Sequence, residues 1–375
     1  MATPRYRFRE SSAWRTPTVV QRECAEVLNS LPATSGIVTL PCGSGKTRIA
    51  IEQALQHRSV LFLSYETAGV LQFAEALREH TTIDPKAIVV LTGNAKQIPQ
   101  TSDCFLCTHY GMLTFASSGG RSTTSAETAA VLNFIFKHPW DAICADEVHH
   151  APAPTYGPAL ARIVKNSGKV LGFTATPIRK LPNATLERLP LCNEERAAAV
   201  NSIFEFIGPC LYAKTWKEME AAQLIAKMTF VLTEVPLCPT FELAYELADG
   251  ITQSYVGSLP PSKLEAIYNI TRMHMSRNET GIIYSDHLFQ AEVLSKLLGD
   301  GWHVLRGQAA DGEPATDSVH VSPEARMALK HRLNSDDPEM HGIIATSVAD
   351  AALDIHSPRF VYGISVDASS SETTN

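Results

Sequence analysis

The stretch TLPCGSGKTRIA at residues 39–50 limits the fold more than any other part of the sequence. An apolar run ends at Leu40, a turn contains Gly43 and Gly45, and a helical pattern follows. A glycine turn between a strand and a helix directs several backbone N–H groups and the positive end of the helix at one point, which suits a polyphosphate. We therefore expect an α/β fold that binds a nucleotide at this turn.

The side chains of this loop are of the types that hold ATP and Mg²⁺. Lys46 is expected to reach the β and γ phosphates, and Thr47 to hold Mg²⁺. The generic P-loop pattern has a glycine where this chain has Leu40, so a plain glycine turn at a strand–helix junction is the alternative. The candidate ATP-binding residues of the loop are Pro41, Cys42, Gly43, Ser44, Gly45, Lys46 and Thr47.

Apolar runs of strand type alternate with segments of helical period along most of the chain. This alternation is typical of parallel sheets with helices on both faces, and 375 residues are enough for two domains. We expect a basic N-terminal arm at 1–15, a first α/β domain at 16–207, a bridge with a helical insertion at 208–265, and a second α/β domain at 266–375.

Composition narrows the class of protein but leaves the partner open. The net charge of -7 and pI near 6.0 argue against a uniformly basic nucleic-acid binder, although a local groove can still be positive. No apolar run reaches the length of a membrane span and no secretory signal is present, so we expect an intracellular protein. Cys104 and Cys107 form a CxxC without a second pair, which favours buried thiols over a zinc ribbon.

A second candidate site lies in DAICADEVHH at 141–150. An apolar strand that ends in Asp146 and Glu147 places both carboxylates at the carboxyl edge of a sheet, where doubly wound folds bind ligands. Asp146 suits Mg²⁺ coordination, and Glu147 suits a base that polarises the attacking water. His149 is expected to couple this site to other elements, because adjacent histidines do not readily chelate one metal ion.

A third element is KVLGFTATP at 169–177, which again predicts a strand followed by a turn. The hydroxyls of Thr174 and Thr176 are expected to hydrogen-bond the carboxylates of the second site and to sense the γ phosphate. A Thr-Ala-Thr stretch is ordinary strand sequence, so the evidence for its function is that it follows the other two elements along the chain.

The order GKT, DEVH and TAT, followed by a second α/β domain, is that of superfamily 2 helicases and translocases. LPCGSGKT, CADEVHHAPA and GFTATPIR resemble the versions found in the XPB family, a family of DNA repair and transcription helicases. FIGPCLYAKTWKEMEAAQLIAKM (206–228) is similar to the bridge between the domains of that family, GIIYSDHLFQAEVL to its motif IV, and IIATSVADAALDI to its motif V.

The resemblance implies two RecA-like domains that close on ATP and Mg²⁺, with DNA bound across both. It also implies work in a transcription and repair complex, and therefore location in the nucleus. Thr67, Thr108 and Tyr110 are the implied contacts to the DNA backbone. Gln21 is the candidate for the adenine contact, with an exposed helix glutamine as the alternative, and Asp354 of motif V is a further ATP-binding candidate.

The chain also departs from the family pattern. The family's Arg-Glu-Asp element is replaced by Arg179, Lys180 and Leu181, which puts the unwinding role of that element in doubt. Motif V is expected to lead to a Gln-Arg-x-Gly-Arg segment, motif VI, whose arginines stabilise the γ phosphate. The sequence ends at SVDASSSETTN, where that segment is expected to begin, so we expect an incomplete second domain and a chain truncated before motif VI.

The N-terminal arm is rich in arginine, and three roles are open for it. It can contact phosphate, form a solvated tail, or act as a short organelle-targeting segment. The arginines of the arm and of the segment that follows it are Arg5, Arg7, Arg9, Arg15 and Arg22.

These patterns together predict an ATP-dependent DNA helicase or translocase of the XPB type. Two alternatives share its features: a non-catalytic DNA- or protein-binding scaffold that keeps an ATP site, and another superfamily 2 motor such as an RNA helicase or a restriction-type translocase. ATP turnover in the presence of duplex DNA, RNA or neither separates the three.

Overall fold

A computed structural model shows how the chain folds, and it describes residues 5–65, 67–92, 103–117, 126–151, 157–176, 203–204, 206–285, 287–305, 319–320, 323–335, 337–346, 355 and 357–366. The chain divides into two compact units, Met1–Met228 and Thr229–Asn375. The division falls inside the segment that was expected to form a bridge.

Unit 1 contains a seven-stranded parallel sheet with the strand order β3-β4-β2-β5-β6-β1-β7. Parallel strands with short, strongly apolar runs need cover on both faces, and β2 (SVLFLS) is buried along its whole length. The strands are β1 (Gly36–Thr39), β2 (Ser59–Ser64), β3 (Ile88–Leu91), β4 (Cys104–His109), β5 (Ala142–Asp146), β6 (Lys169–Thr174) and β7 (Cys210–Ala213).

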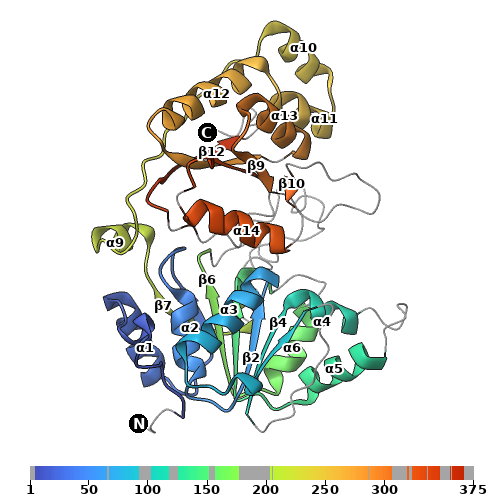
Figure 1. Cartoon of the computed structure of the whole chain (residues 1–375). Coiled ribbons are helices and arrows are strands. Elements are labelled where there is room, and N and C mark those ends of the chain that lie inside the picture. The colour runs from blue at the N-terminus through green and yellow to red at the C-terminus, as the bar shows by residue number, and fades with distance from the viewer. Residues whose placement is uncertain are drawn as a thin grey trace. The chain divides into compact units, whose positions relative to one another are not determined.

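Helices cover both faces of this sheet (Figure 1). One core lies under α1 (Val19–Ser30), α2 (Lys46–Ala54) and α3 (Thr67–His80). A second core lies under α4 (Tyr110–Ser117), α5 (Ala126–Lys137) and α6 (Gly157–Lys165). In α3 the buried residues Val70, Phe73, Ala74 and Leu77 follow the spacing of one helical face, which explains how that sequence docks as a helix.

The N-terminal arm packs against unit 1 from residue 5 onward. Phe8 forms an antiparallel bridge with Thr81, and the guanidinium of Arg9 donates to the carbonyls of Thr81 at 2.7 Å and Arg78 at 3.0 Å. These carbonyls close the C-terminal end of α3, where a cation is favoured. The expectation of a solvated tail is therefore wrong for this part of the arm, because its arginine has partners within the domain.

The segment that resembles the family's bridge begins inside the first unit. β7 pairs in parallel with β1, and Met219 of α9 (Trp216–Ala221) is buried in the core of unit 1. The hydroxyl of Tyr212 donates to Glu23 of α1 at 2.9 Å, so β7 is also tied to the helix beside it. β7 thus extends the first sheet, and residues 208–228 belong to unit 1.

Unit 2 contains a five-stranded parallel sheet with the strand order β10-β9-β11-β8-β12. One face packs against α12 and α13, and the other packs against α14. The strands are β8 (Thr280–Ser285), β9 (Trp302–Leu305), β10 (Val319–His320), β11 (Gly342–Ala345) and β12 (Phe360–Val366). The helices are α10 (Pro239–Leu247), α11 (Gly250–Ser258), α12 (Pro261–Met275), α13 (Leu288–Leu298) and α14 (Pro323–Asn334).

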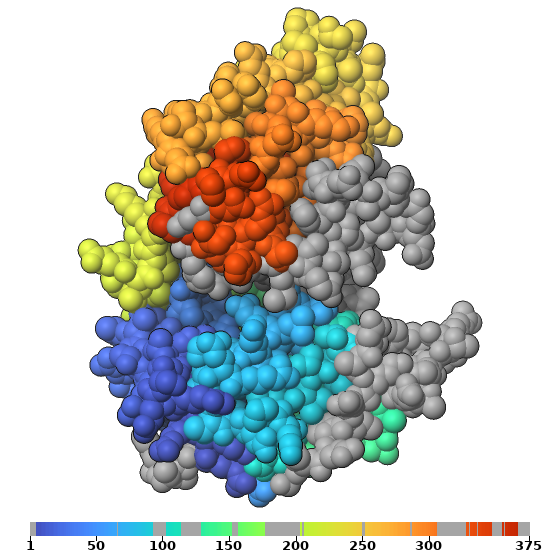
Figure 2. Space-filling model, viewed as in Figure 1, coloured from blue at the N-terminus to red at the C-terminus, as the bar shows by residue number. Residues whose placement is uncertain are grey.

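The helical insertion of unit 2 is attached to the sheet through a buried amide. Gln290 of α13 is fully buried, receives a hydrogen bond at 2.5 Å from the hydroxyl of Ser285 at the end of β8, and donates to the carbonyl of Ser258 at the end of α11. By contrast α10 contains no buried residue, and Figure 2 shows the yellow stretch that includes it at the surface of the unit.

The predicted fold class is confirmed: the chain has two α/β units, each with a parallel sheet. Within the described residues, no helix is long and apolar enough to cross a membrane.

Candidate functional site

The phosphate-loop candidate forms a tight turn between β1 and α2. Gly43 and Gly45 have φ values of 76° and 83°, a region that L side chains rarely adopt. α2 begins at Lys46, as the sequence predicts. The first N–H groups of any helix lack intrahelical partners, so this turn offers several donors and the positive end of α2 at one place.

Gln21 is part of this loop's support. The residue is 8% exposed, its Nε2 donates to the carbonyl of Ser44 at 3.2 Å, and its Oε1 accepts from the N–H of Thr18 at 3.0 Å. A Cβ atom at Gly45 would collide with the same amide, so glycine is required there on two grounds. The alternative of an exposed helix glutamine is therefore wrong. The amide keeps one further donor and one further lone pair for another contact.

Two side chains of the loop fit a phosphate group. The ammonium of Lys46 donates to the carbonyls of Leu40 at 3.2 Å and Pro41 at 3.3 Å, which holds the charge over the loop. The hydroxyl of Ser44 is buried and has no hydrogen-bond partner within the described residues. A buried hydroxyl without a partner is costly unless another group satisfies it, and a phosphate oxygen can accept its proton.

The other two sequence elements lie beside this loop because their strands are neighbours. β6 pairs with β1 on one side and with β5 on the other, with Thr39 opposite Thr174 and Asp146 opposite Phe173. The N–H of Leu40 donates to the carbonyl of Thr174 at 3.1 Å, which links the loop directly to the TAT element. The carboxyl ends of β1, β6 and β5 therefore bring the three motifs together.

The two adjacent carboxylates of β5 have opposite pKa shifts. Burial, with the neighbouring charge of Glu147, raises the pKa of Asp146 to about 6. Burial would also raise the pKa of Glu147, but the hydrogen bond from His149 and the charge of Lys46 outweigh it and lower that pKa. Glu147 is thus ionised near neutral pH and able to accept a proton. It also has a φ of 46°, a left-handed value that costs energy for a residue with a side chain.

His149 connects Glu147 to the TAT element. Its Nδ1 lies 3.3 Å from Oε2 of Glu147 and 2.9 Å from the hydroxyl of Thr174. That hydroxyl donates to the carbonyl of Thr176 and accepts from the N–H of Thr176, so its remaining lone pair faces Nδ1. This network assigns the Nδ1–H tautomer to His149. Thr174 thus reaches the carboxylate through the histidine rather than by the direct bond that was expected.

The candidate DNA contacts differ in accessibility. Thr67 begins α3 and is partly exposed. Thr108 is fully buried and donates to the carbonyl of Leu91 at 2.7 Å, while Tyr110 is 1% exposed and donates to the carbonyl of Asp146 at 3.0 Å. The side chains of Thr108 and Tyr110 therefore support the interior of the domain, which corrects the expectation that they contact DNA directly.

Several predicted residues fall elsewhere. Asp354 of motif V and the Arg179–Leu181 stretch lie outside the described residues. Cys104 and Cys107 are buried in β4, and burial raises the pKa of both thiols, as expected for core residues.

Among the residues that the structure describes, no group of three or more His, Cys, Asp and Glu could hold a metal ion. Mg²⁺ commonly uses one or two protein ligands together with substrate phosphates, so the assignment of Asp146 and Thr47 to Mg²⁺ stays a prediction.

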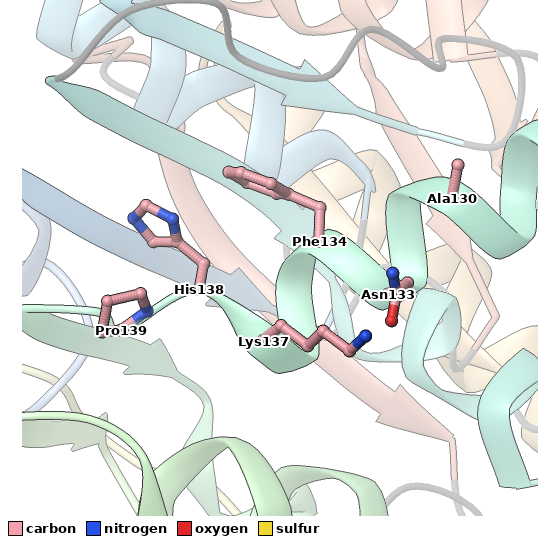
Figure 3. A pocket seen from close by; sticks show the side chains of 6 residues that line it. All are labelled: Ala130, Asn133, Phe134, Lys137, His138 and Pro139. Carbon is pink, nitrogen blue, oxygen red and sulfur yellow. The ribbon is translucent and has the colours of Figure 1, made fainter.

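An open depression of about 490 Å³ lies at the other end of this sheet. It is lined by Phe134, Lys137, His138 and Pro139, at the end of α5 and in the turn before β5 begins (Figure 3). Asp146 is the last residue of β5, at the opposite, carboxyl end, and Glu147 follows it. The depression is thus separate from the three motifs.

Sequence reasoning did not include Tyr65, and it considered His150 only as a metal ligand, a role that it did not favour. The ring of Tyr65 stacks on His150 with centroids 3.9 Å apart, and His150 lies 4.0 Å from His149. The available signal is the position of Tyr65 directly after an apolar strand, which is where the other two sites also begin.

The chain is similar in sequence to a restriction enzyme subunit family and to helicase/translocase subunits. The family model of the type III restriction enzyme res subunit matches residues 17–179. The factor IIH helicase/translocase subunit XPB/SSL2 of Saccharomyces cerevisiae is 25% identical over 74% of this chain, and XPB of Danio rerio is 26% identical over 86%. These matches cover 30% and 36% of the relatives' own lengths, so the chain spans about a third of each.

Solved structures share the fold at low identity. The helicase domain of Pyrococcus furiosus Hef matches with a TM-score of 0.50 and 14% identity, covering 93% of this chain and 88% of that chain. Saccharomyces cerevisiae Dbp5 bound to RNA and ADP BeF3 matches with a TM-score of 0.54 and 12% identity, covering 94% and 75%. Over most of its length the chain is thus similar in sequence to XPB helicase/translocase subunits. Its two units have the RecA-like fold, as the motifs imply.

Proposed function

We propose that the chain is the motor core of an ATP-dependent DNA helicase or translocase of the XPB type. The observation that supports this most directly is the meeting of the GKT, DEVH and TAT elements at the carboxyl ends of β1, β5 and β6. A phosphate loop, a pair of carboxylates with divergent pKa values and a histidine link to the neighbouring strand are among the parts that ATP hydrolysis needs.

Different residues of unit 1 bind the phosphates, hold the metal ion and accept a proton during ATP hydrolysis. The loop N–H groups and Lys46 bind the phosphates, and Thr47 and Asp146 hold Mg²⁺. When bound, Mg²⁺ neutralises charge on the phosphates. Glu147 accepts a proton from the attacking water, and its lowered pKa keeps it in the required ionised form. Gln21 presents its free donor and lone pair to the adenine from beside the loop.

The nucleic acid and the assembly are proposed from the relatives. The curated relatives are named as subunits of a general transcription and DNA repair factor, and we propose DNA as the substrate and such a nuclear complex as the setting. Thr67, at the start of α3, is the side chain of unit 1 that we propose touches the DNA backbone. The rival functions are a non-catalytic DNA- or protein-binding scaffold that keeps an ATP site, and another superfamily 2 motor such as an RNA helicase or a restriction-type translocase.

The first prediction tests the nucleotide site. Replacing Lys46 with Ala should weaken Mg²⁺-ATP binding by roughly 10- to 100-fold, because a charge-assisted hydrogen bond contributes about 1.5–3 kcal/mol. Isothermal titration calorimetry measures the affinity, and Lys86→Ala, on a surface turn away from the loop, is the matched control. Equal affinity in both variants and the wild type would refute the phosphate-loop assignment.

The same preparation separates the rival functions. ATP turnover is measured alone, with duplex DNA, with single-stranded DNA and with RNA. Stimulation by DNA supports the proposal, whereas stimulation by RNA alone indicates an RNA motor. Tight Mg²⁺-ATP binding without turnover in any of these conditions favours the scaffold. DNA binding should weaken steeply with salt and show little base preference, because such motors hold backbone phosphates.

A further inference from the structure

Three aromatic rings join the end of β2 to the water-activating carboxylate. Tyr65 stacks on His150 at 3.9 Å with an interplanar angle of 15°, and His150 lies against His149 at 4.0 Å. His149 is in turn 3.3 Å from Glu147. We call Tyr65, His150 and His149 the ring stack.

The sheet itself places these residues side by side. β2 pairs with β5 so that Leu63 lies opposite Ala145. The paired register ends there, and His149 and His150 lie in the short 3-10 helix Val148–His150 that follows β5. The ring stack therefore joins the residue after β2 to the turn after β5, at the ends of two adjacent strands.

The other end of the ring stack is tied to α3. Tyr65 lies two positions before Thr67, the first residue of α3. A Cβ atom at Gly69 would collide with the buried hydroxyl of Ser64, so the first turn of α3 lies close to the end of β2. We expect a displacement at the start of α3 to move Tyr65 as well.

The exposure of Tyr65 also needs a reason. Its side chain is 42% exposed, although it follows a strand that is buried throughout. The described ring contact of this half-exposed side chain is the stack on His150. The strained φ of Glu147, 46°, shows that the backbone at the far end of the ring stack is held in place by its surroundings.

We propose that Tyr65 and His150 are positioning residues that couple the nucleic-acid contact at the start of α3 to Glu147. Binding of DNA near Thr67 fixes Tyr65, the ring stack then fixes His149, and the Nδ1–H of His149 holds the carboxylate of Glu147 toward the attacking water. This inference rests on the proposed function and specifies how DNA and nucleotide affect one another in that site.

The test is the coupling between the two ligands. The rate of ATP hydrolysis is measured with and without a saturating duplex DNA for the wild type, for Tyr65→Ala, Tyr65→Phe and His150→Ala, and for the Tyr65→Ala/His150→Ala double variant. We expect DNA to raise the wild-type rate at least about fivefold, the lower end of the usual range for coupling between two sites. Tyr65→Ala and His150→Ala should bring this stimulation close to one, without additivity in the double variant, while the affinity for AMP-PNP in the absence of DNA stays unchanged.

Tyr65→Phe distinguishes positioning from a general structural role. This variant keeps the stacking ring and loses only the hydroxyl, so it should retain the coupling. Coupling that survives in Tyr65→Ala, or that is lost equally in Tyr65→Phe, would overturn the role of the ring stack while leaving the proposed function intact. A wild-type chain that binds neither AMP-PNP nor DNA would instead refute the proposed function.

Discussion

The amino and carboxyl ends of the unit 1 sheet belong to the same strands but differ in how fully their polar and charged groups are paired. At the amino end, the carboxylate of Asp141 accepts from the N–H groups of Arg58 at 2.9 Å and Ser59 at 3.0 Å. Asp103 is paired with Arg5 and Arg58. The acidic groups before β4 and β5 thus have partners close at hand.

At the carboxyl end the polar groups are less well satisfied. Ser44 has a buried hydroxyl without a partner among the described residues, Asp146 has its pKa raised to about 6, and Glu147 has a left-handed backbone. Local rules of stability tend to be broken where a ligand or a reaction will use the group. The difference teaches that the amino end stabilises the unit, whereas the carboxyl end is arranged for a ligand.

The largest effect should come from the carboxyl end. Replacing Glu147 with Gln removes the proton acceptor, and ATP turnover should fall by roughly 100- to 10,000-fold while Mg²⁺-ATP affinity stays within about threefold. The variant should melt at the same temperature as the wild type or higher, because it relieves the repulsion that helps to raise the pKa of Asp146.

Steady-state kinetics and differential scanning fluorimetry check these outcomes. Glu147→Asp, which keeps the charge on a shorter side chain, is the matched control and should retain part of the turnover. If Glu147→Gln hydrolysed ATP as fast as the wild type, the carboxyl end of the sheet would not hold the proton acceptor, and the proposed difference between the two ends would be wrong.

The amino end should give the opposite signature. Replacing Asp141 with Ala leaves the N–H groups of Arg58 and Ser59 without their acceptor, so the melting temperature should fall by a few degrees. Mg²⁺-ATP affinity, measured by calorimetry, should not change. Asp141→Asn keeps one acceptor oxygen and should recover most of the stability. If Asp141→Ala lost as much Mg²⁺-ATP affinity as Lys46→Ala, the amino end would not be limited to stabilising the unit.

The sequence was informative where a site is built from neighbouring residues. The loop from Gly43 to Lys46, the carboxylates that end β5 and the start of α2 were all predicted, because each depends on local backbone geometry. The alternation of apolar runs and helical segments likewise predicted both parallel sheets.

Contacts between distant segments were not predictable in this way. Arg9 bonds to carbonyls about seventy residues away, so its charge alone indicated phosphate or solvent. Tyr65 and His150 meet because β2 pairs with β5, a register that one sequence does not reveal. Thr108 and Tyr110 were assigned to DNA through the family resemblance, but their places in the sheet and in α4 bury their side chains.

The smallest predicted effect concerns the N-terminal arm at the amino end of the sheet. The hydrogen bond from Tyr6, together with those from Arg58 and Arg5, lowers the pKa of Asp103 below its ordinary value. A carboxyl group whose pKa is lower in the folded than in the unfolded state stabilises the fold at neutral pH. This contribution is lost as pH falls below about 4, toward the folded-state value.

Urea unfolding of the wild type and of Asp103→Asn at pH 7 and at pH 4 and below tests this. The wild type should be modestly more stable at pH 7, and the difference should shrink as the pH falls, because Asn has no charge to lose. Hydrogen exchange of residues 5–15 should rise in parallel, since the arm is held through Arg5 and Tyr6. The nucleotide loop should keep its protection over the same range, because Asp103 belongs to the opposite end of the sheet. A pH-independent difference between the two proteins would show that shape rather than charge holds the arm, and the paired acidic groups of the amino end would then stabilise the unit only as hydrogen-bond acceptors.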